Sequence, residues 1–247
     1  MTEKILTGKI VRERIVVLEA PRVSDEILLG FRLLGDPVSA VSDALDEIGV
    51  HGQVAASALM PTMPGVVIVG SALTLHNVVR VEDPMINVRA RDNRMAEIEA
   101  HNLARPGDVL VIQGVADVSN MGGVGSQIGK RQGELGAVID GGIRDVNHSR
   151  SVGYPIWATG RTPLTGKWRL ETIQINGSVV ICGVRVHPGD LVVADDTGVC
   201  FVPRERAAEV LAYARKKTDS EEAQCARVDA GVSVPELAGV KRAPNKE

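Results

Sequence analysis

The sequence predicts a mixed α/β protein with a strand-rich, barrel-like or sandwich centre and helices outside it. Two observations lead to this prediction. Apolar runs of strand length recur along the chain, and some, such as residues 108–112 and 136–140, are apolar on both faces. Helical patterns accompany these runs, so helices or a second sheet can cover the strands. Because the chain has no internal repeat, low-complexity tract or linker, we expect a single domain over residues 1–247.

Helices are expected where apolar residues recur at helical spacing between a capping residue and a glycine. The first such segment contains Ile27, Leu28 and Phe31, with Ser24 as its N-cap and Gly35 at its end. A long charged segment near the C-terminus is expected to form the last helix, followed by a loose polar tail over residues 238–247. The expected helices span residues 24–35, 42–49, 95–103 and 204–230.

Strands are expected at the apolar runs between turn residues. The dipeptide Asn176-Gly177 is a strong hairpin signal and predicts that residues 172–175 pair with residues 178–181. Turns at residues 187–190 and 195–198 precede the last two strands. The expected strands span residues 14–18, 66–69, 71–79, 108–112, 136–140, 155–158, 172–175, 178–181, 191–194 and 199–202.

The composition argues against several classes of function. Lys and Arg number 28 and Asp and Glu number 31, so the net charge of −3 does not suit a nucleic-acid-binding protein. The aromatic residues are 2 Phe, 2 Tyr and 2 Trp, too few for a base-stacking surface. No apolar run has the length of a membrane span, and the N-terminus lacks the pattern of a secretion signal. Three cysteines without C-x-x-C spacing indicate a reduced, cytoplasmic chain.

A glycine-rich loop follows the expected strand 108–112. Gly122, Gly123 and Gly125 would allow positive φ angles and direct successive N–H groups at one point, and Ser126 begins a helical pattern. A loop at a helix N-terminus attracts a phosphate or a carboxylate. A turn that needs glycine only for steric reasons is an equally good interpretation of the loop alone. The spacing matches neither a P-loop nor a dinucleotide-binding fingerprint.

A charged turn follows the expected strand 136–140, at the strand end where layered α/β proteins bind ligands. Arg144 offers a planar fork for a carboxylate or an oxyanion, and Asp145 offers oxygen ligands suited to Mg²⁺ or Mn²⁺. If a helical turn starts at Asp145, His148 shares its face and could bind the same metal. The alternatives are a surface ion pair for Arg144 and Asp145 and a solvated side chain for His148.

Taken together and in this order, several segments resemble the RraA-like family. That family includes divalent-metal-dependent class II pyruvate aldolases acting on 4-hydroxy-4-methyl-2-oxoglutarate and 4-carboxy-4-hydroxy-2-oxoadipate. The resemblance extends roughly from Val41 to Pro203. It rests on residues 41–45, 105–111, 122–125, 140–145 and 186–190, with Asp195, Gly198 and Val199 after them.

The resemblance implies a layered αββα sandwich with a swivelling-domain-like, barrel-like centre, assembled as a homotrimer or hexamer. It implies a lyase, either an aldolase or an oxaloacetate decarboxylase, that converts a small 2-oxo acid to a pyruvate enolate. In this interpretation Arg144 and Asp145 are catalytic, and Arg144 also binds the substrate. The amides of Gly122, Gly123, Val124 and Gly125 hold the substrate carboxylate. Mg²⁺ or Mn²⁺ is held by Asp145 and His148.

The chain departs from the aldolase motif at one position. The aldolases have an Asp, then twenty residues, then Arg-Asp, whereas this chain has Gly123, residues 124–143, and then Arg144 and Asp145. Some relatives with Gly at this position carry an acidic residue three places after the motif Asp, where this chain has His148. An imidazole there could replace the missing carboxylate as a metal ligand.

A second hypothesis is a non-catalytic protein that regulates ribonuclease E by direct contact, since the family also contains such regulators. Some other polar residues could be structural or could line a pocket. Turn or helix-start roles are expected for Asp43, His187, Asp195 and Asp196, and the sequence assigns no role to His76, Asn77, Arg80 or Arg161.

Overall fold

The computed structural model describes residues 4–239 and contains a large mixed sheet with helices on it. The sheet has nine strands in the order β1-β11-β10-β3-β4-β5-β6-β2, with β7 paired to β3. The strands are β1 (Gln53–Ala55), β2 (Met60–Pro61), β3 (Ile68–Val79), β4 (Asp108–Gln113), β5 (Gly136–Ile143), β6 (Ile156–Arg161), β7 (Leu170–Ile175), β10 (Leu191–Ala194) and β11 (Gly198–Val202). A separate two-stranded sheet consists of β8 (Val179–Ile181) and β9 (Val184–Val186).

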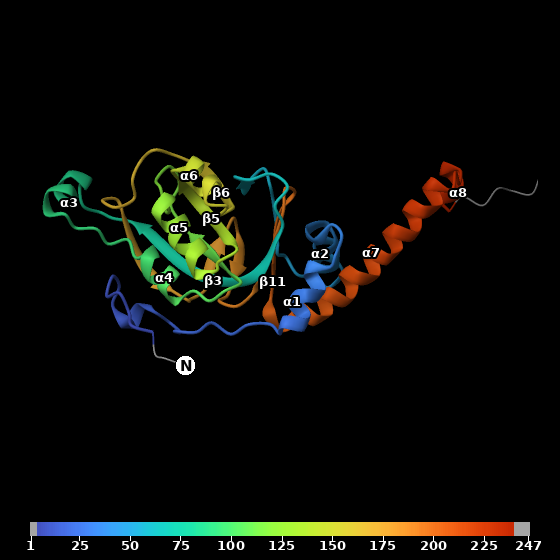
Figure 1. Ribbon diagram of the computed structural model, residues 1–247, viewed down its shortest axis with the longest axis horizontal. Coiled ribbons are helices and arrows are strands. Elements are labelled where there is room, and N and C mark those ends of the chain that lie inside the picture. The colour runs from blue at the N-terminus through green and yellow to red at the C-terminus, as the bar shows by residue number, and fades with distance from the viewer. Residues whose placement is uncertain (1–3, 240–247) are drawn as a thin grey trace, which may run out of the picture.

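Most of the helices form two groups, and α3 stands apart from both (Figure 1). One group follows the parallel strands, and the other contains the two N-terminal helices and the long C-terminal helix, which extends away from the sheet. The helices are α1 (Asp25–Arg32), α2 (Pro37–Glu47), α3 (Pro84–Ala90), α4 (Glu97–Leu103), α5 (Gly123–Gln132), α6 (Val146–Ser151), α7 (Ala207–Asp229) and α8 (Val234–Leu237), with short 3₁₀ turns η1 (Arg12–Arg14) and η2 (Arg204–Arg206). No helix among residues 4–239 is both long and apolar enough to span a membrane.

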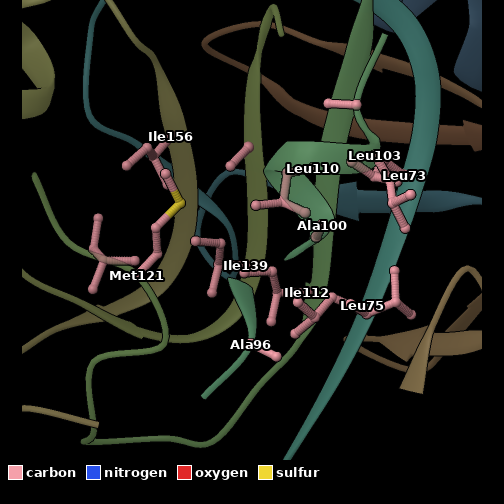
Figure 2. Packing of buried hydrophobic residues seen from close by; sticks show 14 of the residues in the cluster. Leu73, Leu75, Ala96, Ala100, Leu103, Leu110, Ile112, Met121, Ile139 and Ile156 are labelled. Atoms are coloured by element: carbon pink, nitrogen blue, oxygen red, sulfur yellow. The ribbon is translucent and has the colours of Figure 1, made fainter. Parts of the chain in front are cut away.

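Strands β3, β4, β5 and β6 are parallel neighbours and carry the centre of the core. Leu73 lies opposite Leu110, which lies opposite Ala137, so apolar side chains align in rows across the strands. On one face these rows pack against Ala100 and Leu103 of α4 (Figure 2). The other face is covered by the β8–β9 hairpin. Because both faces are covered, these strands are continuous apolar runs, as the sequence predicted.

The parallel strands position the candidate site. Helix α4 lies between β3 and β4 in the chain, α5 between β4 and β5, and α6 between β5 and β6. The loops that leave the carboxyl ends of β4 and β5 therefore emerge at the same edge of the sheet. The glycine-rich loop precedes α5, and the Arg144–Asp145 turn precedes α6.

The structure confirms the predicted mixed α/β class and most of the predicted elements. Helix α1 begins as expected, because the Ser24 side chain accepts a hydrogen bond from the Ile27 amide. Strand β3 joins the two segments expected at residues 66–69 and 71–79 into one strand. The single-domain prediction stays a prediction. Most of the expected loose tail, residues 240–247, lies outside the described residues.

Three predicted elements were wrong. Residues 14–18 form no strand and contribute only an isolated bridge between Ile15 and Ile175. Helix α2 begins at Pro37 rather than Ser42, because proline fits the first turn of a helix, where its missing N–H is not needed. Strand β7 pairs with β3 rather than with β8. Helix α3 was not predicted at all.

The hairpin instead lies one turn further along the chain. Strands β8 and β9 pair across Cys182 and Gly183, whose φ angles of +46° and +89° suit a tight hairpin turn. Nδ2 of the Asn176 side chain donates to the Val17 carbonyl at 2.9 Å, and the Asn176 backbone amide donates to the Thr74 carbonyl at 2.8 Å. Asn176 therefore makes long-range contacts and does not form a hairpin turn.

Candidate active site

The glycine-rich loop and the Arg144–Asp145 turn are in direct contact. The Gly123 amide donates to Oδ2 of Asp145 at 3.0 Å, and the Arg144 amide donates to the Met121 carbonyl at 3.2 Å. Nε of Arg144 lies 3.6 Å from Oδ2 of Asp145. Two segments that are about twenty residues apart in the sequence therefore form one constellation, as expected for loops at the carboxyl ends of adjacent parallel strands.

Two residues before the glycines hold the loop in place. Met121 is buried and its side chain packs among Ile139 and Ile156 of the core (Figure 2). Asn120 is fully buried, and its side-chain amide donates to the carbonyls of Val115 and Gly142. The same side chain thus ties the loop to the end of β5. Sequence analysis missed Asn120, although an asparagine next to a glycine cluster is a frequent loop-stabilising residue.

The glycines are required for close approach and not for a left-handed backbone. The expectation of positive φ angles was wrong: none of Gly122, Gly123 and Gly125 has one, and φ of Gly122 is −136°. A Cβ atom on Gly122 would lie 2.8 Å from Oδ2 of Asp145, and one on Gly123 would lie 2.9 Å from Cδ2 of His148. The absence of side chains lets the Arg-Asp turn and α6 approach the start of α5.

Helix α5 begins at this loop and leaves amides near its N-terminus unbonded by the helix. Its first internal hydrogen bond runs from the Ser126 amide to the Gly122 carbonyl at 3.1 Å. The amides of Val124 and Gly125 precede that bond, as the first amides of any helix do. The Gly123 amide is already bonded to Asp145, so it holds the site together rather than offering a free donor.

The two charged residues remain accessible. The side chains of Arg144 and Asp145 are 32% and 48% exposed. Asp145 has a φ angle of +56°, a left-handed conformation that is uncommon for a residue with a side chain and that occurs more often at functional sites. Its carboxylate is bonded through Oδ2, and the neighbouring guanidinium leaves positive charge beside it.

His148 lies on α6 over the start of α5. Its Nε2 atom is 3.3 Å from Oε1 of Gln127, and its ring covers Gly123. His148 and Asp145 face the same shallow hollow. That hollow is lined by Gly123, Val124, Gln127, Asp145, Asn147 and His148. Of the predicted site residues, Gly123, Val124, Asp145 and His148 line this hollow, whereas Gly122, Gly125 and Arg144 adjoin it without lining it. The roles that the sequence assigned to these residues stay predictions.

The donor set suits a hydrated divalent ion better than a fully protein-ligated one. Among residues 4–239, no group of three or more His, Cys, Asp or Glu side chains is arranged to hold a metal ion. Mg²⁺ usually keeps several waters and binds through one or two carboxylates together with its substrate. One accessible carboxylate, Asp145, and one imidazole, His148, fit that type of site.

A buried polar network lies beneath α5 and was not anticipated. Nδ1 of His101 is 2.8 Å from Oε1 of Glu134, and the Tyr154 hydroxyl donates to the other carboxylate oxygen. Burial and the adjacent Glu134 raise the pKa of Tyr154 well above its usual range. A Cβ atom on Gly125 would lie 3.2 Å from Nε2 of His101, so this network supports the first turn of α5 from below.

Six of the eight remaining polar residues that the sequence analysis named have structural partners. Asp43 forms an ion pair with Lys217, and Arg80 is buried in an ion pair with Asp92. The other contacts are those of Asp195 with the Thr197 amide, Asp196 with the Gly65 amide, His187 with Ser178, and Asn77 with Asn120.

Comparisons with known proteins show the family to which the chain is similar. Residues 38–201 match the RraA-like family, described as Aldolase/RraA. A protein of Halalkalibacterium halodurans, provisionally named a 4-hydroxy-4-methyl-2-oxoglutarate aldolase, is 32% identical over 76% of this chain and 82% of its own length. The crystal structure of Streptomyces coelicolor RraAS2, titled an unusual member of the RNase ES inhibitor RraA protein family, is 30% identical with a TM-score of 0.68. The match covers 83% of this chain and 98% of the RraAS2 chain.

Protein DlpA of Legionella pneumophila is 30% identical over 69% of this chain. The match spans only 27% of the length of DlpA. Similarity to DlpA therefore concerns one part of a longer protein.

Proposed function

Because the chain belongs to the RraA-like family, we propose that it is a divalent-metal-dependent carbon–carbon lyase that converts a 2-oxo acid to a pyruvate enolate. Its substrate is a 4-hydroxy-2-oxo acid in an aldol cleavage, oxaloacetate in a decarboxylation, or both. The observation that carries the proposal is the contact between the Gly123 amide and Asp145, with the Arg144 guanidinium beside it.

Both reactions place the same negative charge in the site. In the aldol cleavage the C4 hydroxyl loses its proton, and the C3–C4 bond breaks with its electron pair moving toward C3. In the decarboxylation, loss of CO₂ leaves the same electron pair. The product in each case is the enolate of pyruvate, which becomes pyruvate when C3 takes up a proton. A site that stabilises this enolate can therefore serve both reactions.

The residues of the site have separate tasks in this proposal. Arg144 binds the substrate carboxylate and adds positive charge beside the developing enolate oxygen. The amides of Val124 and Gly125 orient the substrate at the start of α5. Asp145 and His148 would hold the metal, which when bound supplies Lewis-acid stabilisation of the enolate oxygen. The Gly123 amide keeps the Asp145 carboxylate in place.

Release of pyruvate tests the proposal directly. Purified protein with Mg²⁺ or Mn²⁺ is expected to release pyruvate from oxaloacetate or from a 4-hydroxy-2-oxo acid. Arg144→Ala and Asp145→Ala are each expected to lower kcat/KM by at least about a hundred-fold, because each removes a charge that the transition state uses. Both variants should keep the melting temperature of the parent.

Matched controls test whether a loss of activity comes from the candidate site or from the removal of one charge anywhere on the protein. Arg185 lies exposed on β9 and Asp219 lies exposed on α7, so Arg185→Ala and Asp219→Ala remove the same charges without touching the site. Both controls should retain full activity. Absence of pyruvate release from every substrate with either metal, or site variants as active as the parent, would contradict the lyase assignment.

A second candidate function is regulation of a ribonuclease by direct contact, favoured by the similarity to Streptomyces coelicolor RraAS2. A regulator of this kind would bind a ribonuclease of the E type and slow RNA cleavage. Such inhibition should survive Arg144→Ala, since the exposed contact surface rather than the charged turn would be responsible. Pyruvate release without ribonuclease inhibition supports the lyase over the regulator.

A further inference from the structure

An apolar groove continues from the candidate active site along α5. It is lined by Val124, Gln127, Ile128, Lys130, Arg131 and Val152. Val124 and Gln127 also line the hollow that contains Asp145 and His148. The groove and the hollow therefore adjoin each other, and a molecule held at Asp145 can extend past Val124 into the groove.

The groove differs in chemistry from the hollow. Its apolar lining consists of Val124, Ile128 and Val152, and no acidic side chain lines it. Val124 is 74% exposed at the mouth of the groove, next to the amides at the start of α5. An exposed apolar side chain at the edge of a charged site has no role in holding the fold, and it offers a surface for an apolar part of a ligand.

The basic residues of the groove follow its apolar residues along α5. Helix α5 rises about 1.5 Å per residue, which places Ile128 about 6 Å and Arg131 about 10 Å beyond Val124 along the axis. The Lys130 ammonium already donates to the Gly153 carbonyl at 3.1 Å. A substituent on C4 that enters the groove past Val124 would therefore meet the carbon atoms of Val124 and Ile128 before it reaches the backbone position of Arg131.

From these observations we propose that the substrate of this site is a 4-hydroxy-2-oxo acid whose C4 carries an uncharged alkyl chain lying in the groove. The inference rests on the lyase function proposed above. The C3–C4 bond breaks as described, C4 leaves as the carbonyl carbon of an aliphatic aldehyde or ketone, and C3 becomes the methyl group of pyruvate. No oxidant or reductant is needed. Ile128 and Val152 are specificity-determining residues in this proposal.

Oxamates provide a binding test that does not require turnover. In an N-substituted oxamate the nitrogen takes the place of C3 of the pyruvate enolate, so its substituent takes the place of C4 and of the chain attached to C4. Titration calorimetry with Mg²⁺ present compares oxamate, N-butyloxamate and N-oxalylglycine, which carry no tail, an alkyl tail and a carboxylate tail. N-butyloxamate is expected to bind at least about ten-fold tighter than oxamate, since one fully buried methylene contributes up to about four-fold in affinity. N-oxalylglycine is expected to bind no tighter than oxamate.

Two variants assign the preference to the groove. Ile128→Asn and Val152→Ser should bind oxamate like the parent and lose most of the advantage of the butyl tail. Ile98 is a partly exposed isoleucine on α4, outside the groove. The Ile98→Asn control should therefore retain the whole advantage.

The outcomes distinguish the two proposals. Failure to bind oxamate together with no pyruvate release overturns the lyase function and the substrate class with it. Oxamate binding without a gain from the butyl tail overturns the substrate class alone and leaves the lyase function standing. The proposed substrate class is also overturned if N-oxalylglycine binds more tightly than N-butyloxamate and Arg131→Gln reduces that binding. This result would favour a dicarboxylic substrate.

Discussion

Asp145 and Asp190 each end a short turn, but the two carboxylates differ in exposure and in hydrogen bonding. Asp145, in the Arg-Asp turn of the candidate site, has a side chain that is 48% exposed and accepts one backbone hydrogen bond, from Gly123. Asp190, which ends the Pro-Gly-Asp turn before β10, is 3% exposed. Its two oxygens accept hydrogen bonds from the amides of His187 and Arg204.

The comparison separates structural from functional aspartates. A buried carboxylate with both oxygens bonded to backbone amides fixes the course of the chain and has no oxygen left for a ligand. Asp108, at the other Pro-Gly-Asp turn, is also buried with both oxygens occupied, one by the Arg105 amide and the other by the Arg22 guanidinium. An accessible carboxylate beside a guanidinium keeps binding capacity. The presence of an aspartate in a family motif does not show whether it is structural or functional, whereas its burial and its hydrogen bonds do.

The largest expected effect comes from restoring the aldolase-type acid at the candidate site. Gly123→Asp places a Cβ atom 2.9 Å from Cδ2 and 3.0 Å from Cγ of His148, so the His148 side chain must move and can displace the start of α6. We expect kcat/KM for pyruvate release to fall by about a hundred-fold, as displacements of about 1 Å can cause. The measurement is steady-state kinetics with saturating Mg²⁺.

The double variant Gly123→Asp/His148→Ala is the control, because it removes the ring that the new side chain meets. It should recover most of the lost activity and show that His148 occupies the space of the missing acid. A single variant with the activity of the parent would mean that the approach of α6 to the loop has no influence on the chemistry.

A smaller effect, on stability rather than on activity, is expected at the buried turn. Asp190→Ala leaves two backbone amides without acceptors beside β10, and one unsatisfied buried group typically costs about 1–3 kcal/mol. We therefore expect the free energy of unfolding to fall by about 2–3 kcal/mol in urea titrations. The remaining folded protein should release pyruvate at the parental rate.

Asp145→Ala is the matched control for this prediction. Its carboxylate accepts one backbone amide and is accessible to water, which can replace it, so its loss should change the unfolding free energy by less than about 1 kcal/mol. The two variants should thus show opposite patterns. Equal stability losses would remove the distinction between the two turns.

The sequence predicted the scaffold of the site better than its local geometry. The apolar runs of β4 and β5 and the turns after them are local signals, and they placed Arg144 and Asp145 at one edge of a sheet. Long-range contacts determined what was missed. The Asn176 side chain bonds to Val17, and the hairpin forms later in the chain than the Asn-Gly dipeptide predicted. The close packing of His148 on Gly123 requires glycine there, although the sequence suggested that the glycine supplied a positive φ angle.

The smallest expected effect is a pH dependence of the free energy of unfolding at the buried Asp190 turn. Burial raises the pKa of Asp190 above its usual range, against the hydrogen bonds from the His187 and Arg204 amides, which lower it. A carboxyl group with a raised pKa in the folded state stabilises the fold fully below its unfolded pKa of about 4. That contribution is lost as the pH rises through the folded value. The side-chain amide introduced by Asp190→Asn does not titrate, so the stability deficit of this variant relative to the parent should narrow as the pH rises above about 4 in urea titrations. Asp108→Asn should behave in the same way, because burial also raises the pKa of Asp108. A deficit that widens with pH would show that the fold prefers the ionised carboxylate, and burial would then no longer distinguish these turns from the one at Asp145.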